Sequence, residues 1–151
     1  MDHLVGGNLI VAALLAGHAR PDADADHLGE GPLGAYHAAV AVRAAFGQPG
    51  ALERTYQGPF EPAPCTALLE RRIANTPVHG WDVAQATGQG ADLPDELAMR
   101  ALAFSRDQLT TADRGSWFSP PQDVAEDAPA IDGLVAYLGR TVPPAKEDHG
   151  R

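Results

Sequence analysis

The chain has 151 residues, of which 44% are hydrophobic and 21% charged, and its net charge at pH 7 is −9. This length suits one domain whose core needs neither a disulfide nor a structural metal for stability. The acidic balance disfavours contact with a phosphate backbone, so we expect no nucleic-acid binding. Cys65 is the single cysteine, which excludes an intramolecular disulfide and favours a reducing, cytoplasmic location.

An apolar run over residues 4–16 predicts a core helix over residues 2–17 rather than a targeting segment. The sequence before this run, MDH, lacks the basic start of a signal peptide. The run is also shorter than the about 20 apolar residues that cross a bilayer, so we expect no membrane association. Gly17 fits the C-terminal end of this helix.

Four further helices are expected, because apolar residues recur at helical spacing between segments rich in Gly and Pro. They are predicted at residues 33–46, 67–87, 94–110 and 127–138. Residues 52–64 form the most extended segment, but its prolines argue against a central strand. We interpret that segment as a connection that crosses the end of a bundle.

Several local features of these helices follow from single residues. Thr66 is expected to be the N-cap of the third helix. Pro77 lies inside that helix and removes a backbone donor, which predicts a bend or a compensating interaction. The apolar side chain of Tyr36 is expected in the core, together with either Ala98 or Met99 from the fourth helix.

The predicted elements indicate an all-α fold, with a helical bundle over residues 1–140 and a polar tail over residues 141–151. No internal repeat is evident. A bundle of this kind brings side chains from distant parts of the sequence together inside the helices.

Two histidines are candidates for a metal site, because His3 and His79 lie on long predicted helices among apolar residues. An imidazole inside a bundle has to satisfy both ring nitrogens, and metal coordination is one way to do so. Asn75 lies four residues before His79, on the same helix face. An amide is a weaker ligand than a carboxylate at that position. By spacing alone, a histidine with a structural role is the commoner interpretation, and both remain open.

Other polar residues are weaker candidates for chemistry. The arginines Arg71, Arg72 and Arg100 could bind a carboxylate, although exposed helix charges are the commoner role. We expect His27, in an acidic connection, to be solvated. Cys65 precedes a helix N-terminus, where a thiolate is favoured, but it has no evident histidine partner and no catalytic role is expected.

Two segments carry a family resemblance, HLVGGN at residues 3–8 and VHGWDVAQATG at residues 78–88. They resemble an actinobacterial metal-binding family that is related to mycothiol-dependent maleylpyruvate isomerase, within the DinB-like superfamily. The resemblance covers most of the chain and extends through residues 34–46, 51–55 and 127–140.

The resemblance implies a DinB-like four-helix bundle with long connections, a short extra C-terminal helix and a divalent metal, often zinc, in its core. His3 matches the first ligand of the family and His79 the last, while Asn75 stands where the family has a carboxylate. The usual lead-in before the first ligand is missing, so the first helix is expected to be truncated. Asn75 and Pro77 depart from the family pattern in the turn that bears the ligands. Asp82, in the same motif, is expected to act as a cap or to accept a hydrogen bond from a histidine.

The function implied by the resemblance is that of a divalent-metal-binding protein similar to mycothiol-dependent isomerases and thiol S-transferases. The metal would activate a thiol or water, and the partners would be a low-molecular-weight thiol such as mycothiol and a small-molecule electrophile. A homodimer is compatible with this function. The alternative is a metal-free helical bundle that binds a ligand or dimerises. Asn75 separates the two, because aspartate at this position should tighten metal binding only at a genuine site.

Overall fold

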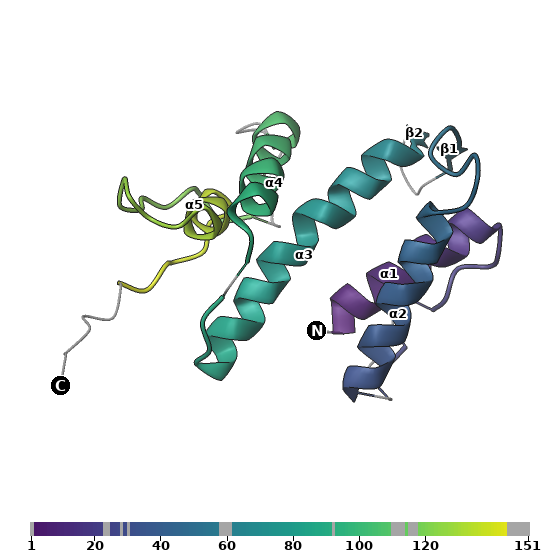
Figure 1. Cartoon of the computed structure of the whole chain (residues 1–151), viewed down its shortest axis with the longest axis horizontal. Helices are drawn as coiled ribbons and strands as arrows, with labels where there is room; N and C mark the ends of the chain where they lie inside the picture. Colours follow the sequence, from purple (N-terminus) through teal and green to yellow (C-terminus); the bar gives the residue numbers. More distant parts are fainter. Residues whose placement is uncertain are drawn as a thin grey trace. The chain divides into compact units, whose positions relative to one another are not determined.

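The computed structural model describes residues 2–22, 25–27, 29, 31–57, 62–91, 93–109, 114 and 118–144. These residues form mostly helices, which confirms the all-α expectation (Figure 1). The helices are α1 (Asp2–Ala16), α2 (Gly31–Phe46), α3 (Cys65–Thr87), α4 (Asp95–Gln108) and α5 (Ala130–Tyr137). Within the described part of the chain, no helix has both the length and the apolar composition needed to cross a membrane.

The segment interpreted as a connection contains a short strand pair. Strands β1 (Thr55–Tyr56) and β2 (Ala63–Pro64) are antiparallel, with Thr55 opposite Pro64 and Tyr56 opposite Ala63. Proline fits here because a two-residue edge needs few ladder hydrogen bonds. The extended segment is therefore paired with itself, and β2 leads directly into α3.

The chain divides into two compact units, residues 1–79 and residues 80–151. In the first unit α1 packs against α2, and α1 and α3 share a cluster of buried side chains formed by Val11, Leu15, Cys65 and Leu68. The predicted division into a bundle over residues 1–140 and a tail over residues 141–151 stays a prediction. Residues 145–151 lie outside the described residues.

In the second unit α4 packs against α5 through small and branched side chains. Ala98 is fully buried whereas Met99 is 58% exposed, so Ala98 is the core residue of the two alternatives. The Tyr137 hydroxyl donates to the Leu109 carbonyl at 3.0 Å. The Arg114 guanidinium lies over the Tyr137 ring, 4.5 Å from its centroid. This contact lets a buried arginine keep its charge beside an aromatic face.

Two local predictions were wrong for identifiable reasons. Helix α3 begins at Cys65, so Thr66 lies inside the first turn and is not the N-cap. The Cys65 amide instead donates to the carbonyl of Arg54, the residue before β1, at 2.9 Å, so a backbone carbonyl satisfies the first amide of the helix. Tyr36 is 65% exposed, because it lies about 200° around α2 from the fully buried Ala38.

Helix α3 continues through Pro77 from Cys65 to Thr87. The Pro77 side chain is among the most completely buried in the chain. Burial of an apolar ring offsets part of the cost of the missing backbone donor. Burial of the Pro77 ring is therefore one compensating interaction, of the kind that the sequence predicts as an alternative to a bend.

The buried faces of the second unit predict which substitutions destabilise it. Leu134→Ala removes a fully buried side chain, and we expect the free energy of unfolding to fall by about 2–5 kcal/mol. Met99→Ala, at an exposed position of the same unit, should change it by less than about 0.5 kcal/mol. Urea unfolding followed by tryptophan fluorescence measures both. Equal losses in the two variants would contradict the assigned core.

Candidate functional site

Helices α1 and α3 run antiparallel through the first unit, and polar contacts fix their register. The Arg72 guanidinium donates from Nη2 to Asn8 Oδ1 at 2.8 Å and to the Leu4 carbonyl at 3.4 Å. Five residues before Asn8 on α1, His3 lies against His79, which is seven residues, or about two turns, beyond Arg72 on α3. Residues nearer the start of α1 thus contact residues further along α3, as expected for antiparallel helices.

This register brings the two predicted histidine ligands together. The ring centroids of His3 and His79 are 5.8 Å apart, and the ring planes are inclined by 71°. His3 is exposed and His79 is half-buried. The pair therefore lies where α1 begins, open to solvent on the His3 side.

The separation of the two rings is compatible with a shared ion. A zinc–nitrogen distance of about 2.0–2.1 Å places each ring centroid about 3.2 Å from the metal, and two rings on one tetrahedral ion then lie about 5–6 Å apart. The observed 5.8 Å falls in this range. An edge-to-face contact between two metal-free rings gives a similar separation, so the distance fits both interpretations.

The third predicted ligand, Asn75, lies on α3 one turn before His79 and is half-buried. Among the described residues, no group of three His, Cys, Asp or Glu side chains is placed to hold a metal ion. The Asn75 amide is the third protein donor that the sequence predicts, and it is a weaker ligand than a carboxylate. The assignment of His3, His79 and Asn75 as ligands stays a prediction.

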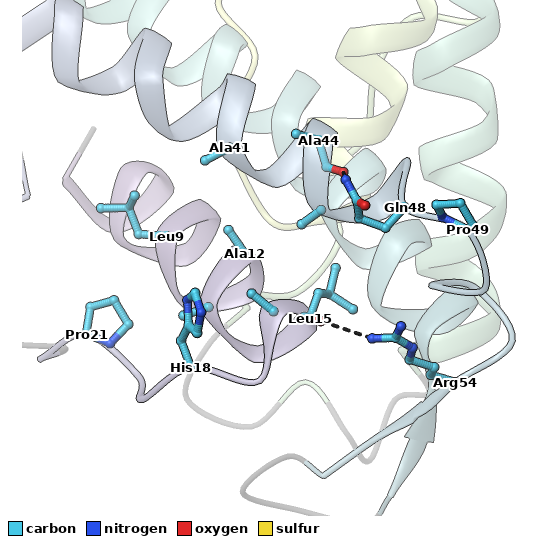
Figure 2. A pocket seen from close by; sticks show the side chains of 13 residues that line it. Leu9, Ala12, Leu15, His18, Pro21, Ala41, Ala44, Gln48, Pro49 and Arg54 are labelled. Carbon is cyan, nitrogen blue, oxygen red and sulfur yellow. Dashed lines mark hydrogen bonds between the residues drawn. The ribbon is translucent and has the colours of Figure 1, made fainter.

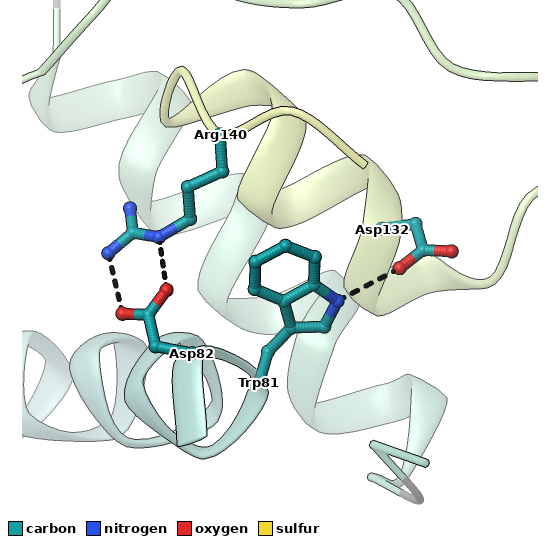
Figure 3. A network of polar contacts seen from close by, with 4 residues as sticks. All are labelled: Trp81, Asp82, Asp132 and Arg140. Carbon is teal, nitrogen blue, oxygen red and sulfur yellow. Dashed lines mark hydrogen bonds and ion pairs between the residues drawn. The ribbon is translucent and has the colours of Figure 1, made fainter. Parts of the chain in front are cut away.

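The other polar residues of the histidine motif hold the second unit together (Figure 3). The Asp82 carboxylate accepts from Arg140 Nε at 2.6 Å and from Nη2 at 2.9 Å. The Trp81 indole donates to Asp132 Oδ1 at 3.2 Å. These contacts join the last turns of α3 to α5 and the residues that follow it. The described role of Asp82 is therefore as an ion-pair partner of Arg140.

The position of His27 differs from the expected solvated one. Its backbone amide donates to Asp2 Oδ1 at 2.8 Å, and its ring lies so close to α1 that a Cβ on Gly6 would come within 2.6 Å of it. His27 is half-buried, and its Nε2 has no hydrogen-bond partner among the described residues. His27 packs against α1 for two reasons: the Asp2 carboxylate accepts from its amide, and Gly6 has no side chain to exclude its ring.

Of the three arginines considered from the sequence, Arg72 alone is half-buried, whereas Arg71 and Arg100 are exposed. Burial lowers the pKa of Arg72 from its ordinary value. Its Nη1 lies where a Cβ on Gly7 would approach within 2.7 Å. Its Nε is buried without a hydrogen-bond partner among the described residues. The partnership with Asn8 was not predicted, although Arg72 and His79 are seven residues apart and share a helix face.

Two hollows of the first unit are lined by described residues. The larger, about 740 Å³, lies between α1 and α2. Figure 2 shows its lining of small and apolar side chains, with His18 near one end and Arg54, which donates to the Leu15 carbonyl at 3.3 Å, near the other. The smaller, about 410 Å³, is lined by residues of α1, α2 and α3, including Arg72.

Two proteins of Mycobacterium tuberculosis are similar to the chain over nearly its whole length. They are the uncharacterized protein MT0763 of strain CDC 1551 and the uncharacterized protein Rv0738 of strain H37Rv, each 35% identical over 145 residues. The aligned region covers 94% of this chain and 78% of each relative. The chain belongs to the family of these mycobacterial proteins. No protein-family model and no solved structure matches it.

The environment of Cys65 predicts that its thiol reacts slowly with alkylating reagents. Cys65 is 1% exposed, and burial raises its pKa more than the nearby charge of Arg54 lowers it. A raised pKa leaves less thiolate at pH 8, so alkylation by iodoacetamide should be at least about tenfold slower in the folded protein than in urea. Mass spectrometry follows the single adduct, and the urea-unfolded chain is the control. Equal rates in the two states would show that the thiol is accessible.

Proposed function

We propose that this protein binds a divalent metal through His3 and His79, with the Asn75 amide as a third donor, in a DinB-like helical fold. The observation that supports this most directly is the approach of two imidazoles, distant in the sequence, to a centroid separation of 5.8 Å. Both rings are carried on helices, which hold ligands with less freedom than loops do. Zinc is the proposed ion because neutral imidazoles suit it.

The donor set determines what such a site can do. Two imidazoles and an amide leave the full charge of a divalent ion uncompensated, so affinity is lower than with a carboxylate in place of Asn75. The exposure of His3 leaves room for a small molecule beside the pair. When bound, the metal would supply Lewis acidity that lowers the pKa of a thiol or water.

The position of Cys65 supports an external thiol as the nucleophile. The thiolate is the reactive form, and the chain's only thiol is buried and has a raised pKa. A thiol-dependent reaction would therefore take its thiol from a low-molecular-weight cofactor such as mycothiol. The second substrate would be a small electrophile, in a transfer or isomerisation in the cytoplasm.

Metal analysis tests the proposal. Protein purified without a histidine tag, incubated with zinc and dialysed, should retain about one zinc per chain by mass spectrometry. The double variant H3A/H79A should lose it, and Asn75→Asp should tighten binding at least about tenfold by adding a negative charge.

The control is His18→Ala, which removes an exposed histidine outside the pair and should leave the zinc content unchanged. Retention of zinc by H3A/H79A would overturn the assignment of the ligands. If neither the native chain nor the Asn75→Asp variant retains zinc, the metal-free alternative of a ligand-binding or dimerising bundle is favoured instead.

A further inference from the structure

The smaller hollow on the first unit has the composition of a ligand groove. Its volume is about 410 Å³, within the range of about 300–1,000 Å³ that is usual for small-molecule sites. Apolar side chains from two helices, Val42, Phe46, Leu69 and Ile73, form much of its lining. We call it the arginine groove, because Arg43 and Arg72 also line it.

Charge in the arginine groove is opposite to that of the whole chain. The net charge of the protein is −9, yet no acidic residue among the described residues lines the groove, whereas two arginines do. Neither Arg43 nor Arg72 has a carboxylate partner within the described part of the chain. A half-buried cation without a counter-ion gains from a bound anion.

The hydrogen bonding of Arg72 leaves part of its guanidinium for such an anion. Nη2 donates to Asn8 and to the Leu4 carbonyl. Nη1 has no hydrogen-bond partner among the described residues and is left to donate to an anion, whereas Nε is buried out of reach of a ligand in the groove. Because Asn8 holds the head of Arg72 from one side, the guanidinium is fixed in position before any ligand arrives.

We propose that the arginine groove binds an amphipathic monocarboxylate of the medium-chain fatty-acid class. The carboxylate lies against Arg72 and Arg43, and the hydrocarbon chain lies along Val42, Phe46 and Ile73. A chain of about eight to ten carbons suits a groove of this size. The proposal is independent of the metal site, since none of these residues is a proposed ligand.

Isothermal titration calorimetry of the 151-residue chain, delipidated before use, tests the class of ligand. Octanoate should bind with a dissociation constant of about 10–100 µM. Octylammonium, which has the same chain and the opposite charge, should not bind, and 1-octanol should bind at least about tenfold more weakly. Equal affinity for octanoate and octylammonium would overturn the proposal.

Substitutions locate the site. Arg72→Met should weaken octanoate binding at least about tenfold, whereas Arg71→Met, at the adjacent exposed position of α3, should leave it within twofold. Because Arg72 also holds α1, circular dichroism checks the folding of both variants. Gly7→Ala keeps the charge but displaces the Arg72 head, since the new Cβ would lie 2.7 Å from Nη1, and should also weaken binding.

A second pair of variants leaves both arginines in place. Ala39→Phe fills the arginine groove from α2 and should abolish octanoate binding. Ala44→Phe adds the same bulk on α2 in the α1–α2 hollow and should not change it. Unchanged affinity in Ala39→Phe would place octanoate elsewhere and overturn the proposal.

Metal removal separates this site from the proposed metal centre. Treatment with EDTA and the H3A/H79A substitution should leave the octanoate dissociation constant unchanged. If either treatment abolishes binding, the carboxylate binds at the histidine pair and the groove assignment is wrong. If neither the native chain nor the Asn75→Asp variant retains zinc while the native chain still binds octanoate, the metal proposal alone is refuted.

Discussion

The hydrogen bond from Arg72 to Asn8 sets the register of α1 on α3, and the arrangement of the first unit depends on that register. The bond is 2.8 Å long and its donor is charged, which makes it stronger than a neutral pair. A slip of one helical turn, about 5.4 Å, would remove both acceptors from a half-buried guanidinium. The same slip would carry His3 away from His79. The proximity of the two imidazoles is thus a consequence of a contact two turns away.

The glycines of α1 help to set how this helix packs on α3 and on the connection that contains His27. Gly6 leaves room for the His27 ring and Gly7 for the Arg72 head. A glycine inside a helix costs about 1 kcal/mol relative to alanine, and two in succession weaken α1 where it also carries His3. The structure offsets this cost by contacts that are possible only because these two glycines have no side chain. The segment HLVGGN therefore carries His3 and also provides the surface on which His27 and α3 pack.

Part of this arrangement could be predicted from the sequence, and part could not. Helix positions followed from apolar periodicity, and α1 was predicted to within one residue because its stop at Gly17 is a local signal. The pairing of β1 with β2 could not be predicted, because a strand of two residues is too short to show an alternating sequence pattern. Thr66 failed as an N-cap because a distant backbone carbonyl replaced the local side chain.

The polar residues divide in the same way. His3 and His79 were predicted to share a site because both lie on long helices and both match ligands of the resembled family, and their rings do lie close together. The position of Arg72 against Asn8 was missed, because the spacing of residues along α3 shows which share a face but not which helix that face meets. Asp82 and Trp81 share a motif with His79, yet their described partners are Arg140 and Asp132. One continuous helix thus carries residues with two different roles, and sequence proximity does not separate them.

The contrast between an acidic surface and a basic groove determines which anions the first unit can select. Over the surface, a net charge of −9 repels anions, but at physiological ionic strength this field decays over about 8 Å. Within the groove the two lining arginines dominate, because no acidic residue among the described ones lines it. A small hydrophilic anion gains little from them after losing its hydration. An anion with a hydrocarbon chain adds about 0.8 kcal/mol for each buried methylene group, so the apolar lining selects the amphipathic anion and the arginines set its orientation.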